Sequence, residues 1–378
     1  MLNLNSRWSI GGACAVTALL LSPIVAFGAR DDGSWTVVSS PSPNPANLLS
    51  SVATLRGHDA WAVGATGTIS QFPPSFQTLT EHWDGTSWSV VPSPSPGTSS
   101  SLSSVAAFTR RDQRDLWAVG SSDSGTLIER WDGSSWTVVP SPSPGTASSL
   151  AGVGAISPRD AWAVGGSTLG TLVEHWDGST WSVVPTPATG TLSGVAALSP
   201  TDAWAVGTAS AKTLVEHWDG ASWSVVPSPN AGTFSNLTSV AANSPNDVWA
   251  VGGSFAQGAA STLVEHWDGS SWTVVPSPSP GSLTALLGVT SVSDRNVWAV
   301  GDANTNSAVP FVPQPLVEHW DGTSWSVVPS ASRDSGGFLA GVDFKSPGRG
   351  WAVGSSTELA TRTNFTLVER FSREDEGD

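Results

Sequence analysis

Short segments in which apolar and polar residues alternate recur along nearly the whole chain. In the segment LVEHW, for example, Leu172, Glu174 and Trp176 fall on one side, and Val173 and His175 fall on the other. A period of two residues is the geometry of a β-strand. The pattern therefore predicts an all-β protein built from many short strands.

Three of these segments recur about seven times each. They are WAVG, preceded two residues earlier by Asp or Asn in six copies, then LVEHW, and then SWxVV; the last copy of LVEHW is degraded and ends at Phe371. The tryptophan of WAVG lies at positions 61, 117, 162, 204, 249, 298 and 351, so six intervals span 290 residues and the mean period is about 48. Repeats of this length are typical of solenoids and propellers.

Each repeat predicts four antiparallel strands. Asp-Gly between LVEHW and SWxVV is a strong hairpin signal, because glycine adopts the positive φ that a tight turn needs. A segment rich in small residues, such as SLAGVGAI, precedes WAVG and suits an innermost strand. The tract PSPSPG follows SWxVV, where proline ends the outermost strand and protects its edge. Because the tryptophans recur once per repeat, we assign them to packing between blades rather than to a ligand site.

The two ends of the chain complement each other. The first SWxVV copy, at 34–38, has no strands before it, whereas the last repeat has no outer strand after it. We predict a seven-bladed β-propeller of four-stranded antiparallel blades over 30–372, with the ring closed by the N-terminal strand joining the last blade. The predicted blades lie at 47–92, 101–140, 149–185, 191–227, 236–276 and 285–329, with the last formed by 338–372 and the outer strand at 34–39.

Residues 1–29 differ in composition from the repeats. One positive charge, Arg7, precedes the uncharged run GGACAVTALLLSPIVAFGA, which ends in small residues. This is the pattern of a signal peptide, with cleavage after Gly28 or Ala29. An uncleaved membrane anchor is the alternative. We expect a secreted protein, extracellular or at the cell surface, and cleavage would remove Cys14, the single cysteine.

The net negative charge of the chain limits the kinds of partner that it can bind. There are 31 acidic and 16 basic residues, which gives a formal net charge of −15. This balance opposes phosphate backbones and anionic membrane surfaces. We therefore expect no nucleic acid partner, and no membrane partner after signal cleavage. The sequence leaves open the role of the acidic tail at 373–378 and the oligomeric state.

The order of segments LVEHWDGTSWSVVPSPSPG, small-residue strand and WAVG resembles kelch repeats of the galactose-oxidase type of β-propeller. The DGxSW turn resembles a shortened Asp-box, the hairpin motif of sialidase-like propellers. The resemblance covers 34–371 and implies a seven-bladed propeller, but the motifs concern architecture rather than activity. Most blades lack the kelch double glycine, and the chain has no tyrosine. The Tyr-dependent copper site and the Tyr nucleophile of those enzyme families therefore cannot be assembled here.

Glutamate, aspartate and histidine also recur once per repeat, in LVEHW and the turns beside it. A glycosidase needs two carboxyls with different pKa values in one cleft, and residues repeated in every blade suit such an asymmetric site poorly. Arg130 and Arg370 replace the histidine in two blades, and arginine is not a metal ligand. We interpret the aspartates as turn residues and the glutamates and histidines as structural polar contacts. We assign no catalytic residue, cofactor or metal.

The segment between WAVG and the next LVEHW varies among blades. Its length is 13, 5, 5, 5, 9, 13 and 11 residues from first blade to last, so the long copies would crowd half of one face. Because loops on a rigid scaffold often carry function, we expect a binding surface there. Its predicted contacts are Phe72, Phe76, Phe255, Asp302, Asn304, Asn306 and Phe311. The alternative is that these loops only fold back on the ring.

These observations favour a secreted, non-catalytic binding module whose partner is a glycan or an extracellular protein. Carbohydrate binding is the preferred hypothesis. Two alternatives stay open: a polysaccharide-acting glycosidase or lyase with carboxylates in the central channel, and a cell-surface structural or protein–protein interaction scaffold.

Overall fold

The computed structural model describes residues 33–55, 58–68, 75–110, 113–304, 312–331, 336–358, 361 and 363–373. All the elements below belong to one compact unit, Gly33–Asp378. The segment predicted as a signal peptide lies outside the described residues, as does the acidic tail except for Arg373.

The described residues form strands and no helix, grouped four at a time into antiparallel arrangements. From the innermost strand outward the groups are β2 (Ala46–Thr54), β3 (Ala60–Thr68), β4 (Ser75–Trp83) and β5 (Trp88–Val90); β6 (Ser100–Arg110), β7 (Gln113–Ser122), β8 (Gly125–Trp131) and β9 (Trp136–Val138); β10 (Ser149–Ser157), β11 (Asp160–Ser167), β12 (Gly170–Trp176) and β13 (Trp181–Val183); and β14 (Thr191–Ser199), β15 (Asp202–Ala209), β16 (Lys212–Trp218) and β17 (Trp223–Val225).

The remaining groups are β18 (Phe234–Ser244), β19 (Asp247–Ala256), β20 (Ala259–Trp267) and β21 (Trp272–Val274); β22 (Leu283–Ser293), β23 (Asn296–Asn304), β24 (Gln314–Trp320) and β25 (Trp325–Val327); and β26 (Gly337–Ser346), β27 (Arg349–Glu358), β28 (Thr363–Ser372) and β1 (Ser34–Val37). One parallel pairing, Ala260 with Leu283, joins the β18–β21 and β22–β25 groups into an eight-stranded sheet.

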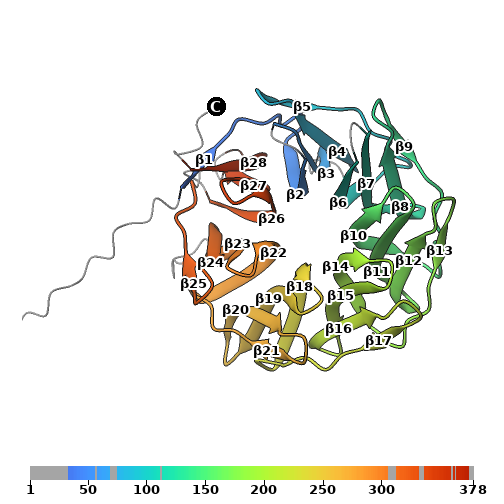
Figure 1. The fold of residues 1–378 in the computed structure, drawn as a ribbon. Helices are drawn as coiled ribbons and strands as arrows, with labels where there is room; N and C mark the ends of the chain where they lie inside the picture. The colour runs from blue at the N-terminus through green and yellow to red at the C-terminus, as the bar shows by residue number, and fades with distance from the viewer. Residues whose placement is uncertain are drawn as a thin grey trace, which may run out of the picture. The chain divides into compact units, whose positions relative to one another are not determined.

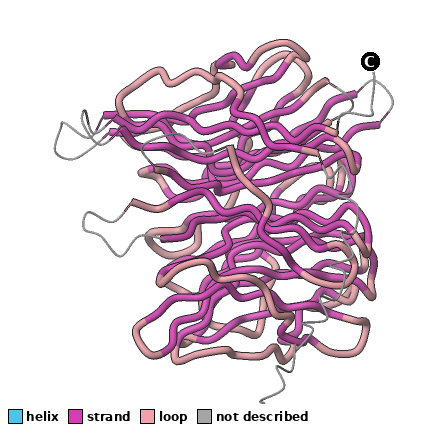
Figure 2. Tube along the Cα trace, turned by 90° about the vertical axis from the view of Figure 1, so that its left-hand side faces the viewer, coloured by secondary structure: helices cyan, strands magenta, loops and turns pink. Residues whose placement is uncertain are grey.

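The sheets are arranged as in a β-propeller. Figure 1 shows β2, β6, β10, β14, β18, β22 and β26 around the middle and the short strands at the periphery. In the perpendicular view of Figure 2 the strands run side by side, and the connecting turns gather at their two ends. Hairpins built on rigid sheets at these two ends are the natural places for a binding site.

The N-terminal strand belongs to the same sheet as the C-terminal strands. β1 pairs antiparallel with β28, with Trp35 opposite Phe371. The Trp35 ring also packs against Trp298 and Phe344, with centroids 5.7 and 5.8 Å apart. A non-local aromatic cluster thus holds the first strand in place.

Tryptophans fill the space between adjacent groups. Trp117 of β7 is fully buried and packs against Trp176 and Trp181 of the next group, with centroids 5.0 and 5.2 Å away. The same arrangement recurs for Trp162 with Trp218 and Trp223. The prediction that the repeat tryptophans pack between blades is confirmed, and their large buried area makes them the main apolar contribution to the core.

Small residues are required where the innermost strands approach one another. Each of these strands has an irregularity in register near its middle, as between Leu150 and Gly152. A Cβ atom on Gly152 would lie 3.0 Å from the Cα atom of Gly194 on the neighbouring inner strand. This close approach explains the Ala, Gly and Ser content of the segment.

The segments predicted as long loops after WAVG are partly extensions of the strands. β19 continues to Ala256 and β20 begins at Ala259, so the expected loop at 253–261 is a hairpin. Gln257 and Gly258 form its two-residue turn, with φ of 53° and 85°. Positive φ at both central residues matches the twist of the paired strands. Similarly, β18 and β22 begin two residues before the predicted blade ranges at 236 and 285.

Candidate functional site

A groove of about 360 Å³ lies where β18, β19 and β20 meet β22. Its lining residues are Phe234, Asn236, Gly253, Ser254, Phe255, Ala260, Thr284 and Ala285. None of these residues is ionisable. The groove is formed by the ends of β18, β19 and β20 of one group and by the start of β22 of the next, so strand pairing holds its walls.

Two phenylalanines form the exposed part of the groove. Phe234 of β18 and Phe255 of β19 are cross-strand partners, so their side chains leave the same face of the sheet. Their exposed fractions are 42% and 41%. Leu283 of β22 lies beside them, because it pairs with Ala260, and it is also exposed. Large apolar side chains gathered in one place and open to solvent indicate a binding surface.

A glycine makes the hollow between these side chains. Gly253 faces Asn236 across the strand pair, two residues from Phe255. A Cβ atom at Gly253 would lie 3.5 Å from Oδ1 of Asn236 and 3.7 Å from the Cβ atom of Ala285. A larger side chain would therefore fill the floor, and the small residues keep the groove open.

The groove also contains an unpaired hydroxyl. Thr284 is 1% exposed, and its Oγ1 atom has no hydrogen-bond partner among the described residues. Hydroxyls at the same repeat position elsewhere do have partners: Ser100 and Ser148 donate to proline carbonyl oxygens at 2.6 and 2.7 Å, and Ser235 accepts from the amide of Ala231 at 3.2 Å. Because an unpaired buried polar atom is costly, the Thr284 hydroxyl is a candidate ligand contact.

Of the seven predicted site residues, the structure places one in the lining of the groove and three elsewhere. Phe255 lines the groove, whereas Asp302 and Asn304 lie on β23, cross-strand from Ala285 and Leu283. Asn304 is buried, and burial raises the pKa of Asp302. Phe76 lies on β4, opposite Gly67, and is partly buried in a different sheet. The other three predicted contacts, Phe72, Asn306 and Phe311, lie outside the described residues.

Sequence reasoning missed Phe234, Asn236 and Thr284. The first was assigned to the connector before the predicted blade at 236, although Phe234 and Asn236 extend the period-two pattern of the following strand. Thr284 looks like any other small polar residue of an inner strand. Its lack of a partner is visible only in the tertiary structure.

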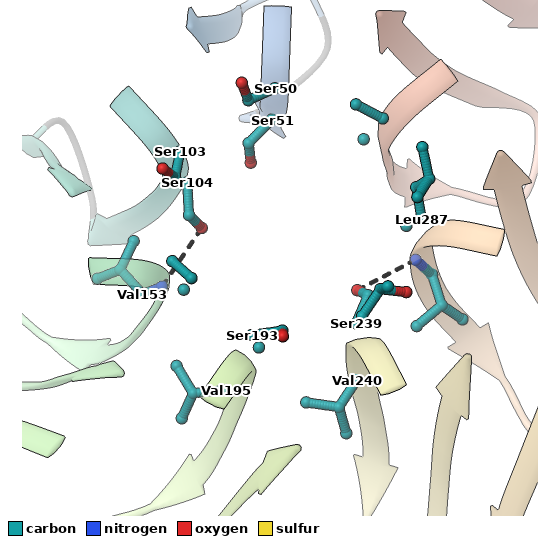
Figure 3. A pocket seen from close by; sticks show the side chains of 18 of the residues that line it. Ser50, Ser51, Ser103, Ser104, Val153, Ser193, Val195, Ser239, Val240 and Leu287 are labelled. Atoms are coloured by element: carbon teal, nitrogen blue, oxygen red, sulfur yellow. Dashed lines mark hydrogen bonds between the residues drawn. The ribbon is translucent and has the colours of Figure 1, made fainter. Parts of the chain in front are cut away.

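A second cavity, of about 200 Å³, lies among the innermost strands, and residues from all seven of these strands line it. Figure 3 shows hydroxyls of Ser104 and Ser239 inside it, which accept hydrogen bonds from the amides of Val153 and Val289 on neighbouring strands at 3.3 Å each. The lining contains no carboxylate. Ser104 and Ser239 therefore join adjacent strands, and the enzyme alternative gains no pair of acids here.

One carboxylate does lie on an inner strand next to this cavity. Oδ2 of Asp343 accepts a hydrogen bond from the amide of Thr54 at 2.6 Å, and Oδ1 accepts one from Oγ1 of Thr290 at 3.4 Å. Burial raises the pKa of Asp343, against the smaller lowering effects of the Thr54 hydrogen bonds and Lys345. Asp343 connects the inner strand β26 to both neighbours, which is a structural role.

Within the described residues, no group of three or more His, Cys, Asp or Glu side chains is placed to hold a metal ion. Among those same residues there is also no helix with the length and apolar character needed to cross a bilayer.

No family model matches the chain, and no curated protein matches it. Several solved structures are similar over most of their length. YCF48 bound to D1 peptide has 13% identity and a TM-score of 0.61, covering 93% of this chain and 98% of that chain. The RRP9 WD40 repeats have 12% identity and a TM-score of 0.61, covering 89% and 97%. Virginiamycin B lyase from Staphylococcus aureus has 10% identity and a TM-score of 0.58, covering 90% and 99%. At such identities the likeness shows the fold alone, which is a β-propeller repeat protein.

Proposed function

We propose that this chain is a non-catalytic binding module that holds a carbohydrate in the groove between β18–β20 and β22. The observation that carries the proposal is the cross-strand pair of exposed phenylalanines, Phe234 and Phe255, beside the unpaired hydroxyl of Thr284. Ligand sites are typically apolar clefts with a few well-placed polar groups. The C–H face of a sugar ring packs on aromatic rings, and its hydroxyls pair with side chains such as Asn236 and Thr284.

The uncharged lining favours a neutral sugar. No ionisable residue lines the groove, so a charged ligand would lose hydration without gaining an ionic partner. The aromatic pair also interrupts the repeat, since the position of Phe255 is occupied by Gly67 in the first group and by Asn304 in the group that follows. We therefore propose one such site per chain rather than equivalent sites between all blades.

We also propose that the chain forms a seven-bladed, kelch-like ring, which β1 closes by pairing with β28. We further propose that the protein is exported and acts outside the cell or at its surface. The antiparallel register of Trp35 with Phe371 supports closure. The apolar run GGACAVTALLLSPIVAFGA supports export.

A glycan-array screen of the full chain, followed by calorimetry with the sugar that binds, tests this function. The variants Phe234→Ala and Phe255→Ala should abolish binding and leave the melting temperature nearly unchanged, because both side chains are exposed. The matched control is Leu169→Ala, which removes a 73% exposed side chain from the hairpin between β11 and β12. Binding that survives both phenylalanine substitutions would reject this site, and the absence of any bound glycan would reject the carbohydrate.

A protein partner is the second candidate. The exposed Leu283 beside the two phenylalanines extends the apolar surface beyond what one sugar ring covers. An apolar peptide segment would use all three side chains. This function would be favoured if the parent chain bound a protein partner, the Leu283→Ala variant did not, and neither chain bound sugar. The cell-surface scaffold alternative requires neither ligand.

A further inference from the structure

The hollow at Gly253 is small and apolar. Besides Gly253 itself, Ala260 and Ala285 line this part of the groove, and their side chains are single methyl groups. A Cβ atom at Gly253 would lie 3.7 Å from the Cβ atom of Ala285, which is ordinary van der Waals contact. The space that the glycine leaves therefore accepts a group of about the size of a methyl. A sugar hydroxyl placed there would lose its hydration, because the alanines offer it no partner.

Thr284, the residue before Ala285, brings a buried hydroxyl to the same lining. Its Oγ1 atom has no hydrogen-bond partner among the described residues. The equivalent hydroxyl of Ser148 donates to the carbonyl oxygen of Pro144, four residues earlier. Pro280 stands at this distance before Thr284, but the Thr284 hydroxyl is not bonded to it. The acceptor used elsewhere in the repeat is therefore not used here.

The connector before Thr284 is bound to other strands instead. The amide of Ala260 donates to the carbonyl oxygen of Ser282 at 3.0 Å, and the amide of Ser282 donates to that of Asn304 at 3.3 Å. Among the described strands, this is the place where two groups join into one sheet, through the pairing of Ala260 with Leu283. Strand pairing thus fixes the connector, and Thr284 keeps a hydroxyl that a ligand can bind.

Asn236 supplies a second polar group beside the hollow. It is the cross-strand partner of Gly253, and its Oδ1 atom would lie 3.5 Å from a Cβ atom at that glycine. A carboxamide oxygen accepts hydrogen bonds, whereas a threonine hydroxyl can donate one. The methyl-sized space is therefore accompanied by one acceptor and one donor, and no charged side chain lines it.

We propose that the bound sugar carries an N-acetyl group and that this group enters the hollow at Gly253. The inference rests on the carbohydrate function proposed above. The methyl of the acetyl group packs against Ala260 and Ala285. Its carbonyl oxygen accepts a hydrogen bond from Oγ1 of Thr284, and its N–H group donates one to Oδ1 of Asn236. The group is neutral, which suits a lining without charge.

The size of the groove fits one such sugar ring. Its volume of about 360 Å³ lies near the lower end of the roughly 300–1,000 Å³ typical of small-molecule sites. The ring itself packs on Phe234 and Phe255, which leave the same face of the sheet and are exposed. The ligand class is therefore an N-acetylhexosamine.

Calorimetry of the full chain with four simple sugars tests the inference. The probes are N-acetylglucosamine and N-acetylgalactosamine, together with glucose and galactose, which carry a hydroxyl in place of the acetamido group. We expect at least one acetylated sugar to bind about tenfold or more tightly than its counterpart, because the acetyl group adds a buried methyl and hydrogen bonds.

The outcomes separate this inference from the function on which it rests. Equal affinities within each pair, or binding only of glycans without an N-acetyl group, would overturn the inference and leave the carbohydrate function in place. Failure of every glycan to bind would reject both.

Filling the hollow gives a second test. Gly253→Ala places a methyl where the acetyl methyl would lie, so it should weaken binding of the acetylated sugar about tenfold or more. Affinity for the unacetylated counterpart should change little. The matched control is Gly166→Ala, the same change at the equivalent position of β11, which does not line the groove. Unchanged affinity for the acetylated sugar in a folded Gly253→Ala chain would contradict the placement.

Saturation-transfer NMR on the parent chain checks the placement without any substitution. A methyl held between Ala260 and Ala285 receives more magnetisation from the protein than the ring protons on the solvent side. We therefore expect the acetyl methyl of the bound sugar to give the strongest relative signal. A methyl signal weaker than those of all the ring protons would overturn the inference.

Discussion

Nε2 of His175 lies 2.9 Å from Oδ1 of Asp160, and its imidazole ring packs on the indole of Trp162 with centroids 4.3 Å apart. The aspartate precedes WAVG, where we expected a turn residue; its carboxylate instead holds the histidine of the next strand. The same pair recurs at His82, His217 and His266. This histidine is a structural contact, fixed against tryptophan by the neighbouring strand.

Removing the carboxylate should leave the histidine without its partner. We expect Asp160→Ala to lower the free energy of unfolding by about 1 kcal/mol. Asp160→Asn should cost less, because Asn296 occupies this position in another group and its Oδ1 lies 2.9 Å from Nε2 of His319. Urea unfolding at pH 7 checks both variants. Equal losses in the two would show that charge, rather than the hydrogen bond, matters.

The N-terminal strand should be essential for stability. Trp35 is 5% exposed and packs in one cluster with Trp298, Phe344 and Phe371. Trp35→Ala should therefore cost about 3–5 kcal/mol, as for other large core truncations. A synthetic peptide of residues 33–40 added to a chain lacking them should restore much of the melting temperature. No rescue by the peptide, and a small effect of Trp35→Ala, would argue against a closing role for β1.

The inner strands should not tolerate even a methyl group at their closest approach. A Cβ atom on Gly341 would lie 2.9 Å from the Cα atom of Ser51 on the neighbouring inner strand. We expect Gly341→Ala to destabilise the chain by about 1–3 kcal/mol, through overpacking. Gly253→Ala is the control, since the nearest atom to its Cβ would be 3.5 Å away and stability should change little. Thermal unfolding distinguishes the two.

Stability should be greatest in mildly acidic solution. The turn aspartates Asp84, Asp177, Asp268 and Asp321 accept side-chain and backbone hydrogen bonds that lower the pKa of each to about 2. Their contribution is present above the ordinary value of 3.8 and is lost as the pH falls towards 2. Glu174 is fully buried, and burial raises its pKa to about 8, so its contribution is present below the ordinary value of 4.5 and is lost as the pH rises towards 8. Melting temperatures from pH 2 to 9 should peak near pH 4–5; a peak at pH 8 or above would contradict these directions.

The unpaired hydroxyl of the groove should affect binding rather than folding. Thr284→Val removes the buried Oγ1 without changing the shape of the side chain. We expect about a tenfold loss of sugar affinity, typical of one hydrogen bond, with unchanged or higher stability. Ser148→Ala is the opposite control, because that hydroxyl already donates to the carbonyl of Pro144 and should matter only for stability. Calorimetry and thermal unfolding separate the two effects.

The repeated local patterns were enough to predict the sheets. Period-two alternation, the Asp-Gly turns and the small-residue segments act within a few residues, so the four strands per repeat follow from neighbours in the chain. The position of Ser34–Val37 as an outer strand also followed from the order of the segments, and the structure pairs it with β28.

The candidate site and the polar pairs depended on tertiary structure. Phe234 and Phe255 are 21 residues apart and meet because β18 pairs with β19, and Thr284 reaches them only because β22 packs against that pair. In the same way, Asp160 meets His175 through the register of β11 with β12. A sequence pattern gives the face on which a side chain lies, but which polar atom is left without a partner depends on contacts across sheets. That information exists only once the strands are assembled.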